Sequence, residues 1–76
     1  FMDNLDLLKR LLAEKVKNPE SITPDATMKD LGIDSLDLVD VVVSMEEELG
    51  ISFEDDELLG LKSVQDVLNL VDKKTK

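Results

Sequence analysis

The sequence predicts an all-α protein, an antiparallel four-helix bundle with three main helices, one short third helix and a long loop between the first two helices. Apolar residues recur at helical spacing in three segments, and each segment starts at a residue type that caps helices. A chain of 76 residues can bury one small core, so we expect a single domain over residues 1–76.

The first helix is expected from about Asp3 to Lys17. Asp3 or Asn4 can cap its start, and the Asn18-Pro19 pair ends it, because the residue before a proline is pushed out of the α region. The apolar face of this helix, which we expect to serve core packing alone, consists of Leu5, Leu8, Leu11, Leu12 and Val16.

A long ordered loop is expected from Pro19 to Ile33, where turn-forming residues are dense. Apolar side chains are spaced through this segment at Ile22, Ala26, Met28 and Leu31. In so small a domain these side chains should hold the loop against the core, so we do not expect a flexible linker.

The second helix is expected to begin at Asp34, with Ser35 in its first turn, and to end at Gly50. Asp37 occupies the third helical position, as in a capping box. The inward face should consist of Leu38, Val41, Val42, Met45 and Leu49. The outward face should consist of Asp37, Asp40, Ser44, Glu47 and Glu48.

Two further helices are expected in the last third of the chain. The segment from Glu54 to Gly60 is acidic and then apolar, which favours one or two turns of helix with acids at the N-terminus. Ser63 should cap the last helix, whose C-terminal lysines suit the helix dipole. Its apolar face should consist of Val64, Val67, Leu68 and Val71.

The charge of the chain is strongly acidic and unevenly placed. Eighteen acidic against nine basic residues give a formal net charge of −9, and no Lys or Arg lies between Asp30 and Leu61. Such a field repels nucleic acid and anionic membranes and attracts basic partners. An acidic excess can also serve solubility alone, but its concentration in one segment favours a binding role.

The missing residue types exclude several classes of protein. With no His and no Cys, the chain lacks the commonest general base, the commonest thiol nucleophile, a disulfide framework and a Cys/His metal site. No apolar run is long enough to span a membrane. We therefore expect a non-catalytic protein without a metal site. We also expect a monomer in the cytoplasm, since a chain without Cys suits a reducing compartment. Phe1 before Met2 is expected to be left over from cloning.

The run Asp30-Leu31-Gly32-Ile33-Asp34-Ser35-Leu36-Asp37 resembles the prosthetic-group attachment motif of acyl carrier proteins. The likeness extends over nearly the whole chain: the first helix, the long loop, an acidic second helix that ends in Glu46-Glu47-Glu48-Leu49, and a last helix that opens with Ser63-Val64-Gln65. An Asp-Ser-Leu tripeptide alone is a weak signal, whereas the extended run in an acidic domain of this length is a strong one.

This resemblance implies a freestanding acyl carrier domain in which Ser35 carries 4′-phosphopantetheine from coenzyme A. The thiol of this arm would carry acyl groups as thioesters between separate enzymes of fatty acid or polyketide biosynthesis. By the same resemblance Asp34 would help to position magnesium while a phosphopantetheinyl transferase attaches the arm, although a capping role explains Asp34 equally well.

A docking face for enzymes with basic patches is predicted on the second helix. Leu36 and Val43 lie off the inward stripe and are rimmed by carboxylates, although single exposed apolar residues are also ordinary. The predicted docking residues are Leu36, Asp37, Asp40, Val43, Glu47 and Glu48.

The family resemblance also implies that the acyl chain can fold back into the core between the last three helices. Residues predicted to bound this acyl-chain cavity are Leu38, Val42, Met45, Leu49, Phe53, Leu58, Leu61, Val67, Leu68 and Val71.

Three other functions compete with this interpretation. A calcium loop starting at Asp30 fails, because Val41 stands where a bidentate Glu is required. An acidic helical adaptor would need no covalent modification. A carrier of aminoacyl or peptidyl groups would keep Ser35 but change the cargo, and the Asp before Ser35 and the acidic second helix favour the acyl type.

Overall fold

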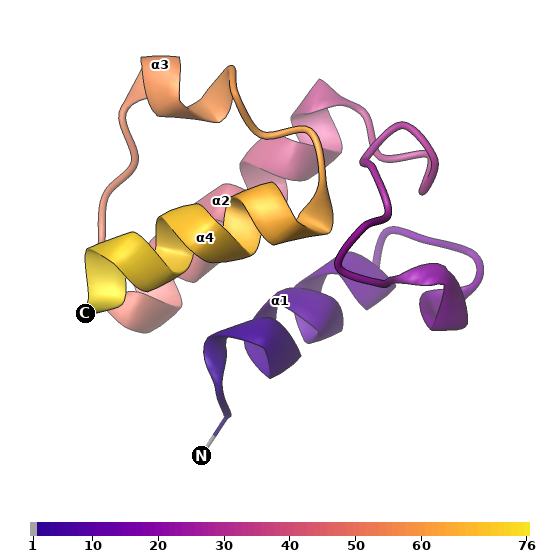
Figure 1. Cartoon of the computed structure of the whole chain (residues 1–76), viewed down its shortest axis with the longest axis horizontal. Helices are drawn as coiled ribbons and strands as arrows, with labels where there is room; N and C mark the ends of the chain where they lie inside the picture. Colours follow the sequence, from indigo (N-terminus) through magenta and orange to yellow (C-terminus); the bar gives the residue numbers. More distant parts are fainter. Residues whose placement is uncertain (1) are drawn as a thin grey trace.

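The structure is a computed structural model that describes residues 2–76, so the expectation for Phe1 lies outside the described residues. It consists of α1 (Asn4–Ala13), a short 3₁₀ helix η1 (Pro19–Ser21), α2 (Ser35–Leu49), α3 (Asp55–Leu58) and α4 (Val64–Thr75). No strand occurs within residues 2–76, and Figure 1 shows the three long helices with α3 on one side of them. The predicted all-α fold is confirmed. Within the described part of the chain, every helix is too short or too polar to cross a membrane.

The second predicted helix is confirmed at both ends. Asp37 N–H donates to Asp34 Oδ1 at 2.9 Å and Asp34 N–H donates to Asp37 Oδ2 at 3.3 Å, which completes the capping box. Gly50 adopts a left-handed conformation with φ of 66°, and its N–H donates to the Glu46 carbonyl. Both ends are fixed by residues close in sequence, which explains why the pattern predicted them.

The first helix is shorter than predicted, because it ends at Ala13 and not at Lys17. Lys15 N–H donates to the Leu12 carbonyl three residues back at 2.9 Å, so the chain leaves the helix in a tight turn before Asn18-Pro19. Val16 therefore lies outside the helix, although it still packs against the core. The predicted apolar face also omitted Leu7, which is buried.

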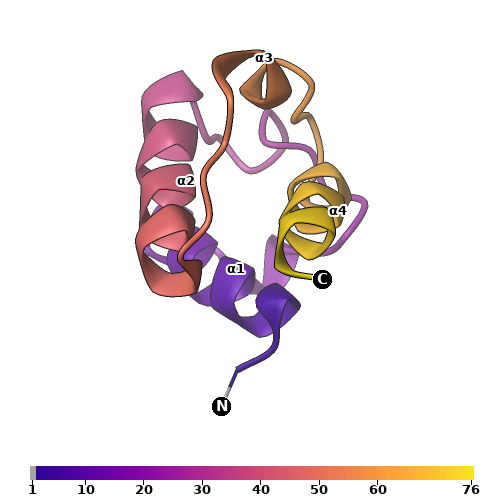
Figure 2. The same ribbon diagram turned by 90° about the vertical axis from the view of Figure 1, so that its left-hand side faces the viewer.

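The core lies between α1, α2 and α4. In Figure 2, α2 and α4 form two sides of the molecule, α1 packs across both, and α3 lies on the side away from α1. Six side chains are completely inaccessible to solvent: Leu8, Leu12, Met45, Val64, Val67 and Val71. Because these come from all three long helices, burial of their apolar surface holds α1, α2 and α4 together.

The loop after η1 is held against the core as predicted. Ile22, Met28 and Ile33 are buried. The backbone N–H of Met28 donates to the Lys62 carbonyl at 2.8 Å, and Val64 N–H donates to the Ala26 carbonyl at 2.9 Å. These bonds fasten the loop to the start of α4 and fix the approach of the chain to α2.

The last two helices begin where the caps predict. Asp66 N–H donates to Ser63 Oγ and Ser63 N–H donates to Asp66 Oδ2, both at 3.0 Å, which opens α4. The short α3 begins after Glu54, whose N–H donates to Glu57 Oε1 at 2.8 Å. None of the residues of α3 is buried, in contrast to the long helices.

Candidate functional site

Ser35 is the first residue of α2 and is exposed to solvent. Its neighbour Leu36 is 80% exposed, so the backbone here presents both side chains outward. Asp34 caps the helix by accepting the N–H of Asp37, and the N–H groups of Ser35 and Leu36 lie at the same helix start. Backbone donors and the positive end of the dipole of a 15-residue helix favour a phosphate group attached at this position.

An apolar pocket of about 300 Å³ opens beside Ser35, between α2 and α3. Its walls are Leu38, Val39 and Val42 from α2, Asp55 and Leu58 from α3, and Leu59 from the turn after α3. Three of the residues predicted to bound a cavity, Leu38, Val42 and Leu58, thus lie at one site with Ser35.

The other predicted cavity residues do not line this pocket. Met45, Val67 and Val71 are fully buried and Phe53 is 9% exposed, so these four belong to the packed core. The remaining three, Leu49, Leu61 and Leu68, are half-buried and pack against that core. The pocket therefore reaches only the α3 side of the predicted cavity.

Three pocket residues, Val39, Asp55 and Leu59, were not predicted from the sequence. Val39 follows Ser35 by four residues and Val42 follows it by seven, so this helical spacing could have placed Val39 beside the serine. Leu59 is 84% exposed and reaches the pocket only because α3 lies over the start of α2. No sequence pattern predicts that placement.

The predicted docking residues lie along the outer surface of α2. Leu36 and Val43 are exposed, with Val43 at 42%, and Asp40, Glu47 and Glu48 are exposed as well. Asp37 is half-buried and its carboxylate accepts the Asp34 N–H. Most of the predicted docking face is therefore open, while Asp37 also stabilises the helix start.

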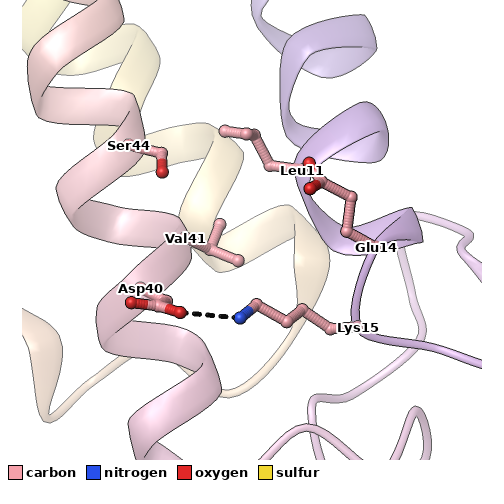
Figure 3. Close-up of a pocket in the computed structure, with 6 residues that line it drawn as sticks. All are labelled: Leu11, Glu14, Lys15, Asp40, Val41 and Ser44. Atoms are coloured by element: carbon pink, nitrogen blue, oxygen red, sulfur yellow. Dashed lines mark hydrogen bonds and ion pairs between the residues drawn. The ribbon is translucent and has the colours of Figure 1, made fainter.

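Two carboxylates of this face form ion pairs, one with Arg10 of α1 and one with Lys15, which follows α1. Lys15 Nζ lies 2.7 Å from Asp40 Oδ2, and Arg10 Nη2 lies 3.3 Å from Glu48 Oε1. Figure 3 shows the first pair at the edge of a pocket of about 170 Å³ between the end of α1 and α2. The hydrogen bond to Asp40 raises the pKa of Lys15 above its ordinary value, so the ammonium of Lys15 stays protonated at neutral pH.

Comparison with known proteins identifies the family. A family model described as "Phosphopantetheine attachment site" matches residues 6–71. An acyl carrier protein of Thermosynechococcus vestitus is 39% identical over 72 residues, which cover 92% of this chain and 89% of the relative. One of Clostridium perfringens is also 39% identical over 72 residues, covering 92% and 95%. This chain belongs to the acyl carrier protein family.

Solved structures of acyl carrier proteins have the same fold. The crystal structure of an acyl carrier protein from Thermotoga maritima superposes with a TM-score of 0.82 at 32% identity, covering 92% of this chain and 84% of that one. The hexanoyl form from the actinorhodin polyketide synthase of Streptomyces coelicolor gives a TM-score of 0.78 at 25% identity, covering 90% and 85%.

Membership of the acyl carrier protein family defines the general role of this chain. It is a non-catalytic carrier, not an enzyme. Its prosthetic group is a covalently attached 4′-phosphopantetheine. The surroundings of Ser35 suit such a group. The helix start offers backbone donors to a phosphate, and the adjoining pocket offers an apolar surface.

Proposed function

We propose that Ser35 carries the 4′-phosphopantetheine arm and that acyl groups travel on its thiol, as thioesters, between separate enzymes of fatty acid or polyketide biosynthesis. The observation that carries this proposal is the position of Ser35. It is exposed at the first turn of a capped helix and borders an apolar pocket. The chain has no Cys, so the thiol must be supplied by the arm.

The start of α2 provides what attachment of the arm requires. An exposed hydroxyl can be reached by a transferase, and the phosphodiester that forms lies near backbone donors at the positive end of the helix. Asp34 is exposed as well, and its carboxylate caps the helix through one oxygen. It could therefore help to position the magnesium ion during transfer while it remains a cap.

The pocket between α2 and α3 provides a place for the acyl chain. Its volume of about 300 Å³ lies at the lower end of the range of about 300–1,000 Å³ that ligand sites occupy. Each methylene buried there would gain roughly 0.8 kcal/mol. An acyl chain in this pocket would lie beside Ser35 and shield its thioester from water.

The charge of the molecule supports enzymes with basic docking patches as partners. The formal charge of −9 attracts such surfaces. The exposed apolar residues Leu36 and Val43 would add contacts once the partner enzyme has bound. A monomer in the cytoplasm fits this role, because a shuttle must leave one enzyme before it meets the next.

Intact mass spectrometry tests the attachment site. The protein is incubated with coenzyme A, magnesium and a broad-specificity phosphopantetheinyl transferase. We expect a mass gain of one phosphopantetheine on the wild type and on Ser52→Ala, an exposed serine outside the site, and no gain on Ser35→Ala. An equal gain on Ser35→Ala would contradict the proposal. No gain on any variant would favour an unmodified adaptor.

A further inference from the structure

The charge of the docking face is not uniform, and its central carboxylate is already paired. Asp40 lies four residues after Leu36, three before Val43 and seven before Glu47, so helical spacing places it on one surface with all three. Its carboxylate is 73% exposed, yet Lys15 Nζ lies 2.7 Å from it. By contrast, no Lys or Arg within residues 2–76 forms an ion pair with Glu47.

The early end of α1 puts Lys15 in this position. Ala13 is the last helical residue and Lys15 follows in a tight turn, so its side chain extends toward α2, as Figure 3 shows. This side chain is only 26% exposed, because its stem lies in the pocket formed with Leu11 and Val41. A lysine held in this way is less free to leave Asp40 than an ordinary surface lysine.

We infer that Lys15 is a specificity-determining residue of the docking face, because it neutralises Asp40 at the centre of that face. This inference rests on the proposed carrier function. A basic partner that binds this face then contacts an ion pair of zero net charge between Leu36 and Val43. The carboxylate of Glu47 stays unpaired and is available to a basic residue of the partner. Lys15 thereby weakens attraction to strongly basic surfaces and admits partners that place a neutral or acidic group opposite Asp40.

Arm transfer by a phosphopantetheinyl transferase with a basic docking face provides the test. The measured quantity is kcat/KM for the wild-type apo protein, Lys15→Met and Lys73→Met at low and high salt. Lys73→Met removes the same charge from an exposed position of α4. We expect Lys15→Met to raise kcat/KM by about threefold or more at low salt, since local charge steers association, and Lys73→Met to raise it by less than about 1.5-fold.

Salt and a second substitution distinguish charge from structure. The gain should vanish in about 1 M salt, where the Debye length falls to about 3 Å. Adding Asp40→Asn to Lys15→Met should return kcat/KM to the wild-type value. Lys15→Gln should raise kcat/KM as much as Lys15→Met does, because both substitutions remove the same charge. Circular dichroism should show that each variant is folded.

Different outcomes overturn different statements. An unchanged or lowered kcat/KM for Lys15→Met, with the arm still attached to Ser35, would overturn the role of Lys15 and leave the carrier function standing. A gain that persists at high salt would also overturn it, because the effect would not be electrostatic. Absence of arm transfer to every variant would overturn the carrier function and this inference together.

Discussion

The two sides of α2 differ in how they are packed. The side that faces α1 and α4 (Figure 2) belongs to the packed core, where Leu8, Met45 and Val71 are completely buried. The side toward α3 leaves a pocket of about 300 Å³ beside Ser35. The difference teaches that the packed core and the pocket beside Ser35 are separate parts of the molecule. The three long helices hold the fold, and α3 covers the site.

Polar contacts hold α3 in place. Lys74 Nζ lies 2.9 Å from Glu57 Oε1, and the same oxygen accepts the N–H of Glu54. Lys74 Nζ also lies 5.6 Å from the centroid of the Phe53 ring. Because a four-residue helix has little stability of its own, these contacts and the packing of Leu58 must fix its position.

Truncation of a core leucine should give the largest effect. Leu12→Ala removes a fully buried side chain and should lower the free energy of unfolding by about 2–5 kcal/mol. Leu59→Ala, in the loop after α3, removes a side chain that is 84% exposed and should change it by no more than about 0.5 kcal/mol. Urea unfolding followed by circular dichroism measures both. Equal losses would contradict the division between the two sides of α2.

Removal of the cation that holds α3 should have a smaller and local effect. Lys74→Met should weaken the hold on α3 by about 1 kcal/mol or less, since it removes one ion pair and one cation–π contact. Hydrogen exchange of residues 54–60 should accelerate while that of α1 stays unchanged. If α1 accelerates equally, α3 is not an independent unit. Lys73→Met provides the matched control.

Acid should affect the capping carboxylates of α4 and α3 differently. Protonation of the α3 cap should have the smallest effect on global stability. Hydrogen bonds from the Ser63 and Lys62 backbone lower the pKa of Asp66, and those from Glu54 and Lys74 lower the pKa of Glu57. A carboxyl with a lowered pKa in the folded state stabilises the fold above its ordinary pKa, and that stabilisation is lost as pH falls through the folded value.

The measurement is thermal unfolding across the acidic range. Asp66→Asn should lower the midpoint at neutral pH and flatten its fall below the ordinary pKa of 3.8. Glu57→Gln should leave the midpoint nearly unchanged and instead accelerate exchange in α3. A large loss of global stability in Glu57→Gln would show that α3 belongs to the cooperative core.

Local signals explain how much of the molecule the sequence predicts. Asp34, Asp37 and Gly50 set both ends of α2 through bonds within a few residues, so both ends of this helix were predicted correctly. The predicted end of α1 was wrong. The turn at Lys15 accompanies an ion pair with Asp40 of α2, which lies 25 residues away in sequence. The cap pattern carries no information about such a contact.

The pocket shows the same limit. Of the residues predicted to bound the acyl-chain cavity, Leu38, Val42 and Leu58 line this pocket, whereas Met45, Phe53, Val67 and Val71 are buried in the core. The place of Leu59 depends on how the loop after Gly50 carries α3 back over Ser35. That path is set by tertiary packing, which no periodicity records.

Acyl loading tests the central claim most directly. The protein is given its arm, loaded with an acyl group from the corresponding acyl-coenzyme A by an acyltransferase, and weighed intact before and after treatment with neutral hydroxylamine. We predict a mass gain of one acyl group on the arm-bearing wild type, its removal by hydroxylamine with the arm retained, and no gain on Ser35→Ala. An acyl gain on Ser35→Ala, or one that resists hydroxylamine, would contradict carriage of a thioester at Ser35.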